Sequence, residues 1–214
     1  MKRLMTLLLG AVLLSAAGPA LAQPLIAAAA KGDVAETERL LKSGADLAAR
    51  DAAGRTALLV ATQANHVAVA RLLIEVGADV NAKDNIEDSP YLLAGASGHF
   101  EILRLTLAKG ADLKSLNRFG GTALIPACER GHVETVRLLL ATGIDINHVN
   151  RLGWTCLLEA VLLSDGGPRH VEIVRMLLTA GARLDIADRD GVTALEHARR
   201  KGQTEIVRLL ETRR

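Results

Sequence analysis

The apolar residues of this chain recur with a long fixed period, and within each period they follow helical spacing. The segment 133–140, for example, places Val133, Val136, Leu139 and Leu140 along one side of a helix with 3.6 residues per turn. A shorter apolar segment precedes each such helix, and a stretch rich in turn-forming residues follows it. The pattern therefore predicts two short helices and one turn-rich loop in every period.

Two independent series of residues measure the period. The glycines of KSGADL and its equivalents step three times by 33 residues and then once by 38, at Gly44, Gly77, Gly110, Gly143 and Gly181. A second series has the same steps, at Asp51, Asp84, Asn117, Asn150 and Asp188. Both series contain the longer step, so five extra residues lie within one unit. A unit of this size cannot bury its apolar side alone, and the repetition predicts a solenoid whose neighbouring units share one core.

Polar and small residues mark where the helices of each unit begin and end. A Ser or Thr side chain can accept a hydrogen bond from a free N–H at a helix start, and we expect this role at Thr56, Ser89, Thr122, Thr155 and Thr193. The glycine of each GAD-like triplet is expected to end the second helix in the left-handed conformation. These signals predict a helix–turn–helix unit followed by a projecting finger.

The 33-residue period, together with the motifs T-A-L, G-H-x-E-x-V, L-L-L and G-A-D-V-N, resembles the ankyrin repeat, most closely over residues 54–84. The resemblance implies an all-α repeat solenoid of stacked helix-turn-helix ankyrin repeats with β-hairpin-like fingers. We expect six units, at 23–53, 54–86, 87–119, 120–152, 153–190 and 191–214. One departure is that the histidine of the family's TPLH motif is replaced, by Leu59, Leu92, Ile125, Leu158 and Glu196.

Residues 1–22 have the composition of a cleavable secretory signal peptide. Lys2 and Arg3 precede an apolar run, and Ala20-Leu21-Ala22 is the small-x-small sequence that signal peptidases accept. The run is shorter than the roughly 20 residues of a membrane-spanning helix, so we expect no membrane association after cleavage. Residues 147–178 also resemble a subset of exported bacterial ankyrin proteins. Together these features predict a periplasmic protein.

Removal of the signal peptide would also remove the net charge. The whole chain has 26 basic and 24 acidic side chains, and two of the basic ones lie in residues 1–22, so 24 of each remain. A neutral chain with a single Trp lacks the basic stripe and the stacking aromatic residues of nucleic-acid-binding proteins. We therefore expect no nucleic-acid partner.

The longer unit contains the segment LLSDGGPRHVEIV at residues 162–174. We expect both of its helices to be intact, with the first extended through Leu162 and Leu163, a loop over 164–168, and Pro168 opening the second. Insertions in repeat proteins often lie on a binding face, but lengthening a surface loop also costs little free energy. The sequence leaves both interpretations open.

No motif typical of a catalytic site is present, such as HExxH, a nucleophile elbow or a P-loop, so we expect neither enzymatic activity nor a cofactor. Four histidines share one repeat position, at His66, His99, His132 and His170. Stacked helices lie roughly 8–10 Å apart, too far for neighbouring histidines to share a zinc ion at about 2.1 Å. We interpret these residues as closing the turn between the two helices by hydrogen bonding, with no metal.

The two cysteines, Cys128 and Cys156, fall at different positions of consecutive units. Their axial offset of five residues corresponds to about 7.5 Å along a helix, and the spacing between units would add to it. A disulfide requires Cα atoms within about 7 Å. We therefore predict that both cysteines stay reduced and form no disulfide.

The resemblance implies that partners bind at the finger tips and on the face of the first helices. The chain's residues at such positions are Arg55, Asp88, Arg118, Phe119, Arg151 and Trp154, and the long loop adds Asp165 and Arg169. Trp and Arg are favoured anchors of protein interfaces. Phe119 and Trp154 either contact a partner or pack between adjacent fingers. Pro126, near the start of a helix, would shape the same surface.

We expect a non-catalytic protein–protein interaction module of the bacterial periplasm, a monomer that holds a protein partner of unknown identity on its concave face. More specific versions are an inhibitor or immunity protein for a toxic enzyme, and a helper that stabilises a periplasmic enzyme, for instance in stress defence. The competing classes are an enzyme or metal-binding protein and a purely structural spacer.

Overall fold

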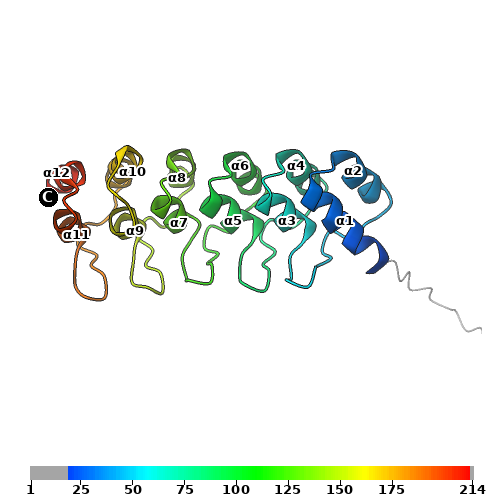
Figure 1. Ribbon diagram of the computed structural model, residues 1–214, viewed down its shortest axis with the longest axis horizontal. Coiled ribbons are helices and arrows are strands. Elements are labelled where there is room, and N and C mark those ends of the chain that lie inside the picture. Colours follow the sequence, from blue (N-terminus) through cyan, green and yellow to red (C-terminus); the bar gives the residue numbers. More distant parts are fainter. Residues whose placement is uncertain (1–18, 213–214) are drawn as a thin grey trace, which may run out of the picture.

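The computed structural model describes residues 19–212, which form six helical hairpins arranged in a row (Figure 1). The first helices of the six units are α1 (Pro19–Lys31), α3 (Ala57–Gln63), α5 (Pro90–Ser97), α7 (Leu124–Glu129), α9 (Cys156–Leu162) and α11 (Ala194–Arg200). The second helices are α2 (Val34–Lys42), α4 (Val67–Glu75), α6 (Phe100–Ala108), α8 (Val133–Leu140), α10 (Pro168–Thr179) and α12 (Thr204–Glu211). Of the predicted signal peptide, residues 1–18 lie outside the described range.

The hairpins stack into two layers. Figure 1 shows the first helices in one layer and the second helices in the other, with the fingers projecting beyond the first helices. One continuous core of buried aliphatic and small side chains runs from Leu25 in α1 to Leu210 in α12. Each buried Leu or Val contributes roughly 1.5–3 kcal/mol, so stacking supplies the stability that a single hairpin lacks. The predicted repeat solenoid is confirmed. Between residues 19 and 212, no helix combines the length and the apolar character needed to cross a membrane.

Helix ends follow the sequence signals in most units. The side chains of Thr56, Ser89, Thr155 and Thr193 each accept a hydrogen bond from the backbone N–H three residues on, as predicted. The triplet glycines adopt positive φ after each second helix, between 80° at Gly44 and 100° at Gly77. The boundaries of the units therefore depend on local backbone chemistry that repeats with the sequence.

Each finger is a hydrogen-bonded turn fixed by one Asp or Asn. Asp51 Oδ1 accepts hydrogen bonds from the backbone N–H groups of Ala53 and Arg55, both at 2.9 Å. The same pair of bonds recurs in the later fingers, at Asp84, Asn117, Asn150 and Asp188. The predicted β-hairpin character is slight, because in residues 19–212 the fingers show a single bridge, between Ala187 and Thr193, and no strand.

The predicted N-cap at Thr122 is wrong. Its buried Oγ1 has no hydrogen-bond partner in the described part of the chain. In the second unit the N–H of Val60 donates to the Thr56 carbonyl at 3.0 Å, whereas the equivalent residue in the fourth unit is Pro126, which has no N–H. The Thr122 carbonyl accepts instead from Ile125 N at 3.3 Å, one residue earlier. Pro126 thus tightens the start of α7 and prevents the cap.

The prediction of two reduced cysteines is also wrong. Cys128 in α7 and Cys156 in α9 form a disulfide, with their Cα atoms 5.7 Å apart. The prediction assumed that consecutive first helices stack side by side in register, so that the offset would add to the spacing. Instead the end of one first helix meets the start of the next. One period earlier, a Cβ at Gly95 would lie 2.8 Å from the Cβ of Ala123.

His66 and His170 contact the preceding unit and do not close their own turn as predicted. His66 Nε2 lies 3.1 Å from the carbonyl oxygen of Ala30, and His170 Nε2 lies 2.9 Å from that of Glu129. Both carbonyls stand near the end of the preceding first helix. Because a carbonyl can only accept, the imidazole N–H donates. These residues therefore link neighbouring hairpins.

The five extra residues of the fifth unit do not lengthen its first helix, contrary to the prediction. α9 ends at Leu162, the repeat position of Gln63 at the end of α3. The insertion forms the loop after α9 and extends the start of α10, which begins at Pro168 as predicted and has 12 residues, compared with eight in α8. The repeat after the insertion is therefore otherwise intact.

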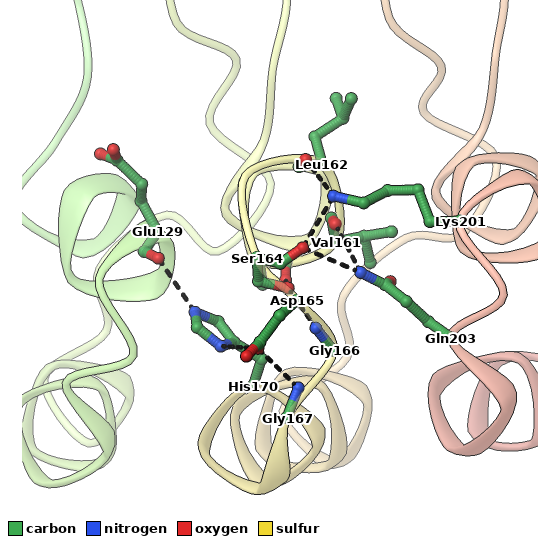
Figure 2. A network of polar contacts seen from close by, with 11 residues as sticks. Glu129, Val161, Leu162, Ser164, Asp165, Gly166, Gly167, His170, Lys201 and Gln203 are labelled. Carbon is green, nitrogen blue, oxygen red and sulfur yellow. Dashed lines mark hydrogen bonds and ion pairs between the residues drawn. The ribbon is translucent and has the colours of Figure 1, made fainter.

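The inserted loop is held by the sixth unit (Figure 2). Lys201 Nζ donates to the carbonyls of Leu162 at 2.6 Å and Ser164 at 2.7 Å. Gln203 Nε2 donates to the carbonyls of Val161 at 3.0 Å and Ser164 at 3.2 Å. These bonds satisfy the carbonyls that the interrupted helix end leaves free. The loop is a packed joint between units.

Candidate functional site

The two consecutive fingers around residues 117–121 and 150–154 each contribute an aromatic residue to one cleft. Asn117 Oδ1 accepts from the N–H of Phe119 at 2.9 Å, and Asn150 Oδ1 accepts from the N–H of Trp154 at 3.0 Å. The fingers are joined through their backbones, because Arg151 N donates to the Phe119 carbonyl at 2.8 Å. The backbones of these two finger tips are therefore held relative to each other.

A cleft of about 180 Å³ opens between these fingers and the helices α7 and α9. We call it the aromatic cleft, and its lining residues are Asn117, Phe119, Gly121, Ile125, Pro126, Glu129, Asn150, Leu152, Trp154, Glu159 and Leu163. Phe119, Leu152 and Leu163 are 48%, 44% and 48% exposed, unusually high for large apolar side chains. A group of exposed apolar residues around a cleft is typical of a binding site. The prediction for Phe119 and Trp154 thus becomes concrete: Trp154 packs partly on the core, and both residues face the cleft.

Two carboxylates also line the aromatic cleft. Glu159 is 5% exposed, and its Oε1 accepts a 2.8 Å hydrogen bond from Asn150 Nδ2. Burial, together with repulsion from Glu129, raises the pKa of Glu159 to about 7, against a smaller opposite effect of Arg130. Within residues 19–212 neither Glu129 nor Glu159 forms an ion pair. The cleft therefore combines aromatic walls with acidic groups that have no cationic partner.

A second cleft occupies the equivalent place between units two and three. We call it the charged cleft, and it is lined by Ala53, Arg55, Leu59, Gln63, Asp84, Asn85, Ile86, Asp88 and Leu93. Arg55 forms an ion pair with Asp51 at 2.7 Å and donates from Nη1 to Gln63 Oε1 at 2.8 Å. The polar groups of this cleft are thus largely satisfied from within the chain.

The remaining predicted finger residues extend from the charged cleft, which Asp88 lines, toward the aromatic cleft. Arg118 forms an ion pair of 3.3 Å with Asp88, and its guanidinium carbon lies 4.9 Å from the centre of the Phe119 ring. Burial raises the pKa of Asp88, while Arg118 opposes this rise. Arg151 Nη1 donates to the Arg118 carbonyl at 2.9 Å. These contacts link the fingers around residues 84–88, 117–121 and 150–154 into one surface.

The residues predicted from the long loop do not line either cleft. Asp165 accepts a hydrogen bond of 2.8 Å from the N–H of Gly167 and lies 4.0 Å from His170 Nδ1 (Figure 2). Arg169 is exposed on α10. The structure thus brings Phe119, Trp154, Arg118, Arg151 and Asp88 together, and it leaves Arg55 in the charged cleft and this loop apart.

Sequence reasoning missed the two carboxylates and the apolar rim of the aromatic cleft. In the sequence, Glu129 and Glu159 are acidic residues on helices, and such residues are usually exposed to solvent. A comparison of positions two repeat periods apart gives the missing signal. Glu159 of the fifth unit stands where the third unit has Leu93, and Glu129 of the fourth unit stands where the second has Gln63. Across residues 19–212, no group of three or more His, Cys, Asp or Glu side chains is arranged to hold a metal ion.

Comparisons with known proteins agree on one family. The chain matches the family model for ankyrin repeats over residues 4–84 and 91–188. No curated protein matches it.

Three solved structures are similar over most of the chain. An ankyrin repeat domain from Acinetobacter baumannii AYE is 58% identical, with 89% of this chain and 97% of that chain covered and a TM-score of 0.86. The ankyrin repeat protein EF0377 is 40% identical, with the same coverage and TM-score. The ankyrin repeat domain of Bcl-3, a member of the IkappaB protein family, is 30% identical, with 89% and 85% covered and a TM-score of 0.78.

Proposed function

Because this chain belongs to the ankyrin-repeat family, we propose that it is a non-catalytic binding protein that holds a protein partner in the aromatic cleft. Ankyrin repeat domains generally mediate protein–protein interactions and are generally non-catalytic. The fingers of units three to five, with Arg118 and Arg151 on their tips, form the surface around the cleft. The proposal concerns which part of this solenoid binds and to what kind of molecule.

The observation that carries the proposal is the combination of Phe119 and Trp154 on adjacent fingers with an apolar rim. Aromatic residues in a concave, partly dehydrated position are the usual centres of protein interfaces. Hydrogen-bonded finger backbones hold the positions from which these side chains project, so less backbone conformational entropy is lost when a partner docks. The charged cleft is a weaker candidate, because Arg55 already satisfies its polar groups.

We further propose that the partner is met in the bacterial periplasm. Residues 1–22 have the pattern of a signal peptide, and a disulfide such as Cys128–Cys156 persists in oxidising compartments and is rare in the cytosol. Whether the protein inhibits its partner or stabilises it follows from the partner's activity, measured with and without this chain.

Site-specific photo-crosslinking in the native host tests the proposed surface. A photoreactive amino acid at Leu152, on the rim of the aromatic cleft, is expected to give a discrete crosslinked protein. The matched control is Ile86, which occupies the same repeat position in the charged cleft and is 53% exposed. A crosslinked protein obtained from Ile86 and none from Leu152 would contradict the proposed site.

The export proposal has its own test. Cell fractionation followed by N-terminal sequencing of the purified protein should find it in the periplasmic fraction, with Gln23 as its first residue. A cytoplasmic protein that retains residues 1–22 would exclude export while leaving the proposed binding surface open.

A further inference from the structure

The charged cleft contains an arginine supplied by the chain itself. Arg55 donates from Nη1 to Gln63 Oε1 and from Nε to Asp51 Oδ2, both at 2.8 Å. The guanidinium therefore lies between the finger and the first helix of the second unit. The charged cleft therefore shows how a cleft at this repeat position can accommodate an arginine side chain.

In the aromatic cleft the same backbone positions carry complementary changes. Two repeat periods after Arg55 the residue is Gly121, and two periods after Gln63 it is Glu129. Gly121 does not have a left-handed backbone, and a Cβ built on it would meet its nearest neighbour, Asn117 Oδ1, at 3.5 Å. Neither conformation nor crowding requires glycine there. The arginine of one cleft has become a glycine in the other, and the amide it contacts has become a carboxylate.

The electrostatics of the aromatic cleft call for a positive charge. Glu129 and Glu159 both line it and repel each other, and Glu159 replaces Leu93 of the charged cleft. The nearby cation, Arg130, directs its Nη1 to the Ala96 carbonyl at 2.8 Å and forms no ion pair with either acid. A buried carboxylate without a cation is costly, and a guanidinium with two carboxylates forms strong charge-assisted hydrogen bonds.

The volume of the aromatic cleft and its aromatic rings restrict the kind of ligand that fits. The cleft volume of about 180 Å³ is below the roughly 300–1,000 Å³ of sites for small-molecule ligands and suits one long side chain. Guanidinium groups stack on aromatic faces. The Phe119 ring already contacts the guanidinium of Arg118 in this way, at 4.9 Å from the ring centre.

We propose that the aromatic cleft binds an arginine side chain of the partner protein, with its guanidinium between Glu129 and Glu159 and its stem along Trp154. The inference rests on the proposed function, because it names the group by which the partner is recognised. The partner's arginine takes the place that Arg55 has in the charged cleft.

Binding of arginine and citrulline derivatives tests the proposal on the purified chain. Nα-acetyl-arginine methylamide and the neutral, nearly isosteric citrulline analogue are titrated by calorimetry. Fluorescence of Trp154, the single Trp of the chain, reports on the cleft itself. We expect saturable binding of the arginine compound and at least tenfold weaker binding of citrulline. The lysine analogue should bind more weakly, because its ammonium cannot form paired bonds with a carboxylate.

Variants connect the binding to the cleft. Glu129→Gln and Glu159→Gln should each weaken arginine binding at least fivefold. Gly121→Arg installs the equivalent of Arg55 and should abolish binding by filling the cleft from within. Glu134→Gln, on exposed α8 of the same unit, removes the same charge outside the cleft and should leave binding unchanged. A thermal unfolding scan of each variant verifies its fold.

The outcomes separate this proposal from the proposed function. Equal binding of arginine and citrulline, no binding of arginine, or full binding by Gly121→Arg would overturn the arginine site. A partner that still crosslinks from Leu152 would then leave the protein-binding function standing. If the arginine compound binds as expected and no protein crosslinks from Leu152, the cleft is confirmed as an arginine site and the proposed protein-binding function fails.

Discussion

The aromatic and charged clefts are built on the same backbone positions two repeats apart, and they differ in almost every side chain that faces solvent. Five positions show the difference, each given as the residue of the charged cleft followed by its equivalent in the aromatic cleft: Ala53 and Phe119, Arg55 and Gly121, Gln63 and Glu129, Asp88 and Trp154, and Leu93 and Glu159. The first set satisfies itself through Arg55. In the second set Glu129 and Glu159 have no ion-pair partner among residues 19–212, and the exposed part of Phe119 lies at the rim of the cleft. One repeat scaffold thus supports both a self-contained surface and one that is open to a ligand.

The difference continues beneath the surface. α7 and α9, which form the floor of the aromatic cleft, are joined by the Cys128–Cys156 disulfide. Thr62 and Pro90 hold the equivalent positions under the charged cleft. A covalent link reduces the freedom of the two units to move apart, which favours a preorganised site. The aromatic cleft therefore differs from the charged cleft in the covalent link beneath it as well as in its lining side chains.

Replacement of the two aromatic residues should have the largest effect, a loss of affinity for the partner. The double variant Phe119→Ala/Trp154→Asp gives the aromatic cleft the residues found at the equivalent positions Ala53 and Asp88. Because an interface anchor contributes about 2 kcal/mol or more, affinity for the crosslinked partner should fall about 100-fold or more. Surface plasmon resonance measures it. The control Ile86→Ala, in the charged cleft, should change affinity less than threefold, and an equal loss there would remove the distinction between the clefts.

Reduction of the disulfide should have the next largest effect. A loop closed by Cys128 and Cys156, 28 residues apart in sequence, constrains the unfolded chain by about 2–4 kcal/mol. Urea unfolding with and without reductant should show this loss in the free energy of unfolding. The variant Cys128→Ala/Cys156→Ala should be insensitive to reductant. Stability of the natural chain that is independent of reductant would contradict a structural role for the bridge.

Glu159 predicts a pH dependence of stability. Its carboxyl loses the proton near pH 4.5 when unfolded and at about 7 when folded, so the folded state binds more protons over this window. Stability therefore falls as pH rises from about 4.5 to 7 and levels off above. Glu159→Gln removes this contribution and should be more stable than the natural chain above pH 7, by about 1–3 kcal/mol.

The check is the difference between the two unfolding curves at several pH values. It should be small at pH 4.5 and grow toward pH 7, while Glu134→Gln should give a difference that does not change with pH. A constant difference for Glu159→Gln would mean that its folded-state pKa is not raised.

Replacement of Pro126 should have the smallest effect. Val occupies the equivalent position at residue 60, where its N–H donates to the Thr56 carbonyl. Pro126→Val can restore that hydrogen bond to Thr122, and we expect a stability gain of about 1 kcal/mol in urea unfolding. A loss of stability would show that the tightened start of α7 is favourable as it stands.

The sequence contained most of the fold, because each unit is defined by residues that act locally. Triplet glycines with positive φ, Asp or Asn at the finger base and Thr or Ser caps each act within a few residues. The errors arose where neighbouring units meet. Crossing of α7 and α9 brought the cysteines together, and the histidines bonded to the preceding hairpin. The failed cap at Thr122 is the exception, since Pro126 is nearby and lacks the N–H that would bond to the Thr122 carbonyl.

The site was predicted only in part for the same reason. Phe119 and Trp154 stood out as rare aromatic residues on fingers, and the structure places both at one cleft. Glu129 and Glu159 did not stand out, because acidic residues on helices are common and their burial depends on the neighbouring finger. A comparison of units at matched repeat positions would have revealed them without coordinates.

Hydrogen exchange of the chain with and without its captured partner tests most directly whether the aromatic cleft is the binding site. Amides of residues 117–125 and 150–159 should exchange more slowly in the complex, and those of 51–59 and 84–93 should be unchanged. Slower exchange confined to the charged cleft, or to the layer of second helices, would contradict the account.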